Sequence, residues 1–138
     1  MDDSCICLDT DVLIAYLKGR EPGASAVERA VKGYNCHVTA ITEYELLFGV
    51  ARARRQIGED ALLGLMTILP LDDDAARRAA TLHDVLIRRN EDIGVKDVLI
   101  AAICLVNGIS LLTSNERHFG RVPGLTVITA STLKMPRR

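Results

Sequence analysis

Four carboxylates in this chain stand at junctions between apolar segments, where a charge is costly to bury without a partner. Asp9 and Asp11 interrupt the stretch ICLDTDVLIAYL at residues 6–17. Glu45 follows an apolar strand candidate, and Asp97 directly precedes the apolar run 98–102. Carboxylate oxygens are hard ligands that suit Mg²⁺ or Mn²⁺, and such ions activate water and neutralise phosphate oxygens. The residue types therefore point to phosphodiester chemistry.

Each acid also has an ordinary structural role. Asp9 or Thr10 can be the N-cap of a following helix, and Thr42 with Glu45 spells a capping box. Asp97 can interact favourably with a helix dipole. Capping does not explain Asp97, however, because an unpaired acid before a buried helix is expensive. A divalent cation shared by Asp9, Glu45 and Asp97 would remove that cost.

Apolar runs alternate with helix-like segments along the chain, which predicts an α/β fold with a mostly parallel sheet. Pro70 favours an edge position for its strand. In a parallel sheet, the strand ends and helix starts share one edge, where ligands bind. We therefore expect the three acids to converge at that edge. Strands are expected over 5–8, 36–40, 68–71, 109–112 and 125–128, and helices over 11–18, 24–32, 42–55, 59–66, 73–89 and 97–107.

Composition restricts the class of protein. The chain has 138 residues, of which 49% are hydrophobic, so a single globular domain spanning 1–138 is expected. A formal net charge of −1 argues against a protein that coats duplex nucleic acid. Aromatic residues make up only 4% of the chain, which argues against binding of nucleic acid through stacking platforms.

The cysteines and the first residues suggest a compartment. The four cysteines lack the spacing of a zinc site and are expected to be small buried residues in a reducing environment. The acidic start MDD is not typical of a signal peptide. No apolar run is long enough to span a bilayer. These features predict a cytoplasmic protein without membrane association. The cysteines are Cys5, Cys7, Cys36 and Cys104.

The ordered set of motifs resembles the PIN-domain ribonucleases, most closely the toxins of VapBC toxin–antitoxin modules. LDTDVLIAYLKG resembles the first block of the family, with Asp9 as its acid. TAITEYELLFG resembles the second block, with Glu45 as its acid. KDVLIAAICLVNGISLLTSNERHFGRVPGL resembles the third and fourth blocks, with Asp97 as the acid. The likeness covers nearly the whole chain.

The resemblance implies a PIN-like three-layer α/β/α sandwich with a mostly parallel sheet of about five strands. It also implies an endoribonuclease that cleaves structured RNA with a water activated by Mg²⁺ or Mn²⁺, the ion being held by Asp9, Glu45 and Asp97. The partners that it implies are an RNA substrate, a small cognate antitoxin whose C-terminal segment lies over the active site, and a second copy in a homodimer.

One position departs from the family pattern. Asn115 stands where a fourth acid is often found, and its amide oxygen can still bind a metal, although it would hold a second metal more weakly. Thr10 and Thr113 are expected to donate hydrogen bonds to the ligating carboxylates. Arg117 and Arg121 are expected to contact phosphate, because their loop lies on the active edge of the sheet.

Three further acids and a histidine have other expected roles. Glu116 or Asp92 could substitute for the missing fourth acid. Asp11 is expected to cap the turn or to support the ligands. His118 is expected to pack or to form a hydrogen bond, and no histidine is placed well enough to be the catalytic base.

Two other functions fit part of the pattern. Asp9 and Asp11 have the Asp-x-Asp spacing of haloacid-dehalogenase-like phosphatases, but the late strand is followed by TSN at 113–115 instead of an acidic pair. A catalytically inactive module that binds RNA or an antitoxin is the other alternative, and Asn115 is the only feature in its favour.

Overall fold

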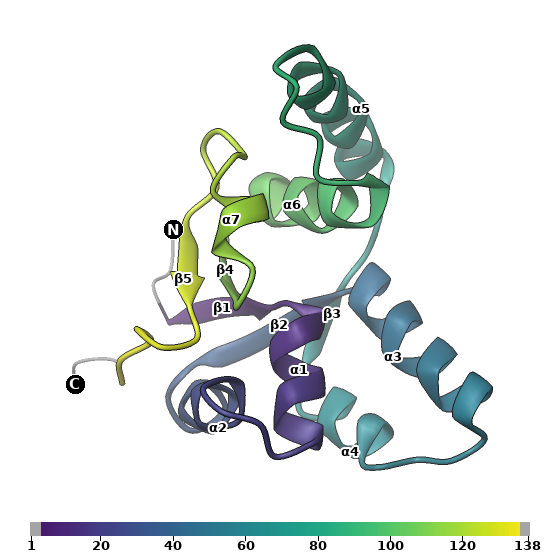
Figure 1. Cartoon of the computed structure of the whole chain (residues 1–138), viewed down its shortest axis with the longest axis vertical. Coiled ribbons are helices and arrows are strands. Elements are labelled where there is room, and N and C mark those ends of the chain that lie inside the picture. The colour runs from purple at the N-terminus through teal and green to yellow at the C-terminus, as the bar shows by residue number, and fades with distance from the viewer. Residues whose placement is uncertain (1–3, 136–138) are drawn as a thin grey trace.

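A five-stranded sheet forms the centre of the molecule in the computed structural model, which describes residues 4–135 (Figure 1). The strand order is β3-β2-β1-β4-β5, and every neighbouring pair is parallel. The chain therefore builds one half of the sheet from β1 to β3 and then crosses to the other side of β1. The strands are β1 (Cys5–Leu8), β2 (Asn35–Thr39), β3 (Thr67–Leu69), β4 (Ser110–Thr113) and β5 (Val127–Thr129).

Helices cover both faces of the sheet and give three layers. Helices α1, α2 and α4 lie below the sheet in Figure 1, α5, α6 and α7 lie above it, and α3 projects from its side. No described helix is long and apolar enough to cross a membrane. The helices are α1 (Thr10–Leu17), α2 (Gly23–Gly33), α3 (Ala40–Ala53), α4 (Glu59–Leu63), α5 (Asp73–Arg88), α6 (Val95–Asn107) and α7 (Glu116–Phe119).

The core consists of two apolar clusters, one on each face of the sheet. Ile6 and Leu8 of β1 belong to the cluster under α1 and α2, whereas Cys7 belongs to the cluster under α5 and α6. Alternate residues of a strand point to opposite faces, so both faces of β1 are buried. A strand that is covered on both faces needs a continuous apolar sequence, which is what this segment has.

The strand order creates a switch point at the carboxyl ends of β1 and β4. From β1 the chain proceeds towards β2, whereas β4 lies on the other side of β1. The two connections leave this edge in opposite directions, and the crevice between them is the usual ligand site of an open parallel sheet. Asp9 follows β1 at this point, and Thr113 is the last residue of β4.

The predicted elements all exist, but α3 begins earlier than expected and the capping box is wrong. Thr39 is the N-cap, and its hydroxyl accepts the backbone N–H of Thr42 at 3.1 Å. Thr42 therefore lies inside the first turn, and Glu45 lies in the second turn instead of the first. The pattern T-x-x-T-x-x-E contains two possible N-cap residues, Thr39 and Thr42. Strand β2 pairs with β3 as far as Thr39, so the helix begins directly after that residue.

Other corrections concern short elements. Helix α4 ends at Leu63, three residues before its predicted end. The four-residue helix α7 was missed, because one turn is too short for an apolar period to show. Pro70 follows β3, which is an edge strand as predicted. Cys7, Cys36 and Cys104 are buried as predicted, but Cys5 is only half-buried.

Candidate active site

Asp9 is delivered by the end of β1 and locked by two donors. Its backbone N–H continues the sheet by donating to Leu112 O at 2.9 Å. Its carboxylate accepts from the Thr10 N–H at 2.8 Å, as the N-cap of α1, and from the Thr113 hydroxyl at 2.8 Å. Asp9 is only 5% exposed. The predicted capping role and the predicted contact with Thr113 are both confirmed, and Asp9 is a buried, oriented carboxylate.

Asp11 belongs to the same cluster. Its Oδ2 lies 3.2 Å from the Ser114 N–H and 3.4 Å from the Thr113 hydroxyl. Burial, and then the charge of Asp11, raise the pKa of Asp9 to about 8, and the charge of Asp97 acts in the same direction. Burial also raises the pKa of Asp11. Asp11 therefore does more than cap a turn, because it adds a second carboxylate to a site that has too little positive charge.

Glu45 reaches the site from α3 and is oriented by Thr10. The Thr10 hydroxyl lies 2.8 Å from Glu45 Oε1 and 3.0 Å from Thr42 Oγ1. One hydroxyl has one proton, so Thr10 donates to the carboxylate and accepts from Thr42. The hydroxyl of Thr39 lies 3.4 Å from that of Thr42. A chain of threonine hydroxyls therefore runs from the end of β2 to Glu45. The predicted Thr10 contact is confirmed, and the two other threonines were missed.

A cation also lies near Glu45. Lys96 Nζ is 3.9 Å from Glu45 Oε2, with the lysine side chain 61% exposed and the glutamate side chain 25% exposed. An exposed pair at this distance contributes little stability. It nevertheless places an ammonium group at the mouth of the site, where the negative charge of the cluster attracts it.

Asp97 lies in the first turn of α6, before its buried face. Its Oδ2 is 3.2 Å from His118 Nδ1, and the two side chains are 27% and 39% exposed. The hydrogen-bonding role predicted for His118 is therefore confirmed. Asp97 is held by α7, which follows β4, so the loop at the end of β4 contacts both Asp9 and Asp97.

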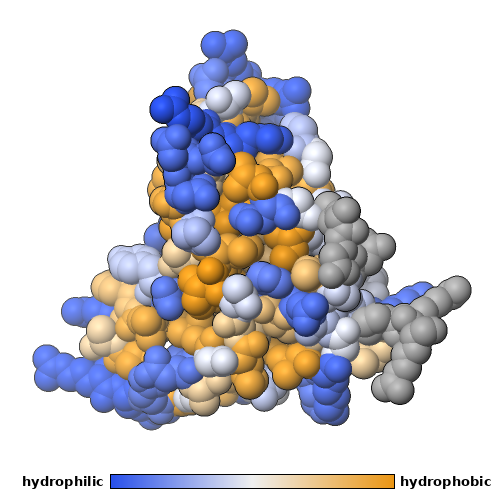
Figure 2. All heavy atoms as spheres, turned by 180° about the vertical axis from the view of Figure 1, so that it is seen from behind, coloured by the Kyte–Doolittle hydropathy of each residue, from blue (hydrophilic) through white to orange (hydrophobic). Residues whose placement is uncertain are grey.

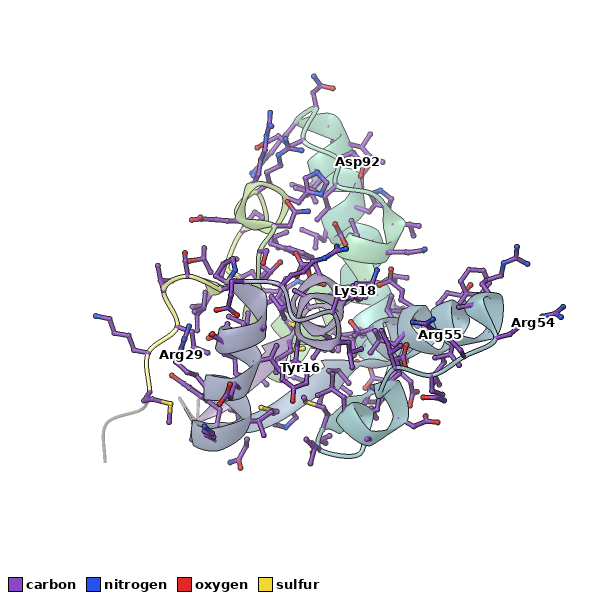
Figure 3. The ribbon with its side chains drawn as sticks, turned by 60° about the horizontal axis from the view of Figure 1, so that its bottom comes forward. Tyr16, Lys18, Arg29, Arg54, Arg55 and Asp92 are labelled. Atoms are coloured by element: carbon purple, nitrogen blue, oxygen red, sulfur yellow. The ribbon has the colours of Figure 1, made fainter. Side chains whose placement is uncertain are left out.

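The remaining predicted residues have definite positions. Asn115 is the N-cap of α7, and its Oδ1 accepts the His118 N–H at 3.4 Å. Arg117 is exposed on α7. Arg121 donates from Nη1 to the backbone oxygen of Asp92 at 3.2 Å, so it holds the segment between α5 and α6. Figure 3 shows Asp92 on that segment. The metal role of Asn115 and the phosphate roles of the arginines stay predictions.

The acids fit a divalent cation by their chemistry. Burial and the charges of Asp11 and Asp97 raise the cost of ionising Asp9, as its raised pKa shows, and a hard cation with oxygen ligands would relieve it. Within residues 4–135, no three His, Cys, Asp or Glu side chains form a ready-made ligand group.

Comparison with known proteins identifies relatives over most of the chain. Residues 6–125 match the PIN domain. The chain is 31% identical over 134 residues to "Ribonuclease VapC1" of Rickettsia felis, covering 92% of this chain and 97% of that protein. It is 33% identical over 115 residues to "Ribonuclease VapC10" of Mycobacterium tuberculosis, covering 83% of this chain and 85% of that protein.

Solved structures share the fold. The VapBC2 complex of Rickettsia felis, bound to a DNA fragment from its promoter, contains a chain with a TM-score of 0.78 at 21% identity, covering 91% of this chain and 98% of that one. VapBC-1 of nontypeable Haemophilus influenzae gives a TM-score of 0.78 at 23% identity, covering 93% and 99%. The predicted three-layer α/β/α sandwich is thereby confirmed.

Proposed function

The chain belongs to the PIN-domain family, and from this premise we propose that it is a metal-dependent endoribonuclease, the toxin of a type II toxin–antitoxin pair. Its curated relatives are named ribonucleases. The observation that carries the proposal is the arrangement at the switch point, where Thr113 holds Asp9 and Thr10 holds Glu45. Family membership leaves no reason to retain the phosphatase alternative. We also propose that residues 1–138 form one such domain.

The chain's own groups have distinct tasks in this proposal. Asp9, Glu45 and Asp97, with Asn115, would hold Mg²⁺ or Mn²⁺, which when bound supplies charge neutralisation at the phosphate and makes a water more acidic. Thr113 keeps the Asp9 carboxylate pointing at the switch point, and Thr10 does the same for Glu45. Preorganised groups need no rearrangement when charge develops on the phosphate.

The RNA would approach over α7. Arg117 is exposed beside the site, so its guanidinium is free to bind a phosphate in the bidentate manner that suits this side chain. Arg121 already uses one nitrogen on the Asp92 carbonyl. It would therefore contact phosphate only through its remaining donors, while keeping the segment before α6 in place.

A groove beside the site suits the antitoxin. A cavity of about 450 Å³ lies between α1, α3 and α4 and includes Glu45 in its lining. Its walls are largely apolar, and two cations, Lys18 and Arg55, line it together with two acids, Glu45 and Glu59. Figure 3 shows Arg54 pointing away from the body of the protein, beyond the nearby Arg55. An antitoxin segment with apolar anchors and an acidic residue would fill this groove and block access to Glu45. Solved relatives include toxin–antitoxin complexes.

A homodimer is the second proposed assembly. Figure 2 shows an apolar band along the middle of the face opposite to that of Figure 1, with polar residues at the corners. A contiguous apolar surface on a protein of this size is typical of an interface. A second copy of the chain is the occupant that we propose for this band.

Cleavage of structured RNA tests the proposed activity. The purified chain would be incubated with a pool of structured RNAs in the presence of Mg²⁺, Mn²⁺ or EDTA, beside Asp97→Asn and the surface control Asp84→Asn. Asp84 pairs with Arg88 on the exposed face of α5, away from the site. We expect metal-dependent cleavage by the wild type and by Asp84→Asn, and none by Asp97→Asn.

Two other results would change the assignment. Absence of cleavage by the folded wild type under every condition would favour the inactive module that binds RNA or an antitoxin. Cleavage that survives EDTA would contradict the metal-dependent scheme while leaving the family unchanged.

A further inference from the structure

The loop after β4 is the only described segment that hydrogen-bonds to the side chains of both Asp9 and Asp97. We define residues 113–118 as the bridging loop. At its start, the Thr113 hydroxyl donates to Asp9 Oδ2 at 2.8 Å and accepts the Asn115 N–H at 2.9 Å. At its end, His118 Nδ1 lies 3.2 Å from Asp97 Oδ2. One short segment therefore connects two carboxylates that are 88 positions apart in the chain.

The position of the His118 ring is built into the loop. Asn115 caps α7 by accepting the His118 N–H through its side chain. The next residue, Phe119, is completely buried in the cluster under α5 and α6. Gly120 then leaves no room for a Cβ, which would lie 2.7 Å from Glu116 O. A capped turn with a buried anchor fixes where the backbone of His118 sits, and so limits where its ring can reach.

Asp97 depends on this contact. Among the residues that the structure describes, the His118 ring is the one group recorded as a hydrogen-bond partner of the Asp97 side chain. A carboxylate can only accept, so Nδ1 carries the proton of this hydrogen bond whenever Asp97 is ionised. Without the ring, an aspartate with about a quarter of its surface exposed would sample several rotamers in water.

We propose that His118 is a positioning residue, which fixes the Asp97 carboxylate in the orientation needed to hold the divalent cation. This inference rests on the proposed function. Hydrogen bonds behind ligating groups set their orientation, and their loss typically weakens metal affinity by roughly 10–100-fold. In this chain the bridging loop, which carries an uncharged Asn115 in place of an acid, acts by orienting Asp9 and Asp97 through Thr113 and His118.

Mn²⁺ affinity of the full chain, measured by calorimetry without RNA, tests the proposal. His118→Phe keeps a ring but removes the donor, and we expect its Mn²⁺ affinity to fall by roughly 10-fold or more. His118→Asn places an amide nitrogen where Nδ1 was, and we expect its affinity to stay within about 3-fold of the wild type. His118→Gln carries the same amide one bond further out, beyond Asp97, and should resemble His118→Phe.

A matched pair elsewhere provides the control. His83 Nε2 lies 2.9 Å from Asp92 Oδ1, outside the candidate site. His83→Phe removes the same kind of histidine–aspartate contact, and we expect no change in Mn²⁺ affinity. Thermal unfolding of each variant separates loss of fold from loss of orientation, and the comparison of Asn with Gln at position 118 stays decisive if the Phe variant does not fold.

The outcomes separate this inference from the proposed function. Wild-type affinity in both His118→Phe and His118→Gln would overturn the positioning role, and so would equal weakening by Asn and Gln. Asp97→Asn should abolish Mn²⁺ binding. If it does not, or if the wild type binds no Mn²⁺, the metal-dependent function fails and the positioning role fails with it.

Discussion

The acid that a strand delivers to the site differs from the two acids that helices deliver. Asp9 follows β1, is 5% exposed, and has both oxygens engaged by donors from its own turn and from β4. The side chains of Glu45 and Asp97 are 25% and 27% exposed, and each has a basic neighbour, Lys96 or His118. The strand end therefore provides an acid that is buried and held at both oxygens, whereas the helices provide acids that are more open to water.

This difference indicates how the site balances its charge. The buried Asp9 has only hydroxyl and amide donors, so its charge is poorly compensated and its pKa is raised to about 8. Glu45 has water and the Lys96 ammonium group nearby, and Asp97 has water and the His118 ring. A divalent ion would therefore interact most favourably with Asp9. That carboxylate is already oriented, and its negative charge has no positive partner.

The largest expected effect follows from removing the charge of the buried acid. Asp9→Asn keeps the size of the side chain but removes the charge of the proposed ligand. We expect cleavage of the structured RNA pool to fall by roughly 10²–10³-fold or more, by analogy with the loss of a preorganised electrostatic group. Asp84→Asn is the control. Activity within a few-fold of the wild type would contradict the assignment of Asp9.

Asp9→Asn should lower cleavage but should raise the stability of the metal-free fold at neutral and alkaline pH. The pKa of Asp9 is about 8 in the fold against 3.8 in the unfolded chain, so between these values the folded state binds more protons than the unfolded state. Metal-free wild type therefore loses stability as pH rises from about 4 to 8, by an amount on the order of a few kcal/mol. Burial of Asp11 acts in the same direction.

Thermal unfolding in EDTA checks the sign. We expect the melting temperature of Asp9→Asn to be higher than that of the wild type at pH 8 and equal to it at pH 4. Added Mn²⁺ should narrow the gap at pH 8, because the cation stabilises only the wild type. A wild-type melting temperature that rises relative to that of the variant between pH 4 and 8 would show that Asp9 is ionised in the metal-free fold.

A pair of threonine variants compares the two regions directly. Thr113→Val leaves Oδ2 of the buried Asp9 without its donor and the Asn115 N–H without its acceptor. We therefore expect a loss of about 1–3 kcal/mol in unfolding free energy and of roughly 10-fold in Mn²⁺ affinity. Thr10→Val frees Glu45, to which water has access, so its loss should be smaller. Chemical denaturation and calorimetry measure both, and an equal loss in the two variants would remove the distinction between the buried acid and the acids that are more open to water.

The smallest expected effect concerns Lys96. Its ammonium lies 3.9 Å from Glu45 Oε2 and is mostly exposed, so the pair is worth roughly 0.2–1 kcal/mol. Lys96→Met removes a competitor for Glu45, and we expect Mn²⁺ affinity to rise by about 1.5- to 5-fold at low salt, with less effect at high salt. A fall in affinity would show instead that Lys96 supports the orientation of Glu45.

The sequence allowed much of the site to be predicted through its motifs. Asp9 and Asp97 flank buried apolar segments, which made both conspicuous, and Glu45 was found by its place in the second family block. The contacts of Thr10 and Thr113 followed from the rule that ligating carboxylates need donors. The Thr39–Thr42 hydroxyl chain was missed, because the local letters fit a cap at Thr42 as well as one at Thr39.

What the sequence by itself determined is the order of apolar strands and helices, and with it the three-layer fold, because burial on both faces of a parallel sheet demands continuous apolar runs. Only the tertiary structure decided which donor serves which acid. Thr113 meets Asp9 because β4 lies beside β1, and His118 meets Asp97 because α7 packs against α6. Such contacts join residues far apart in the chain, and their geometry depends on strand order and helix packing, which no local pattern of residues encodes.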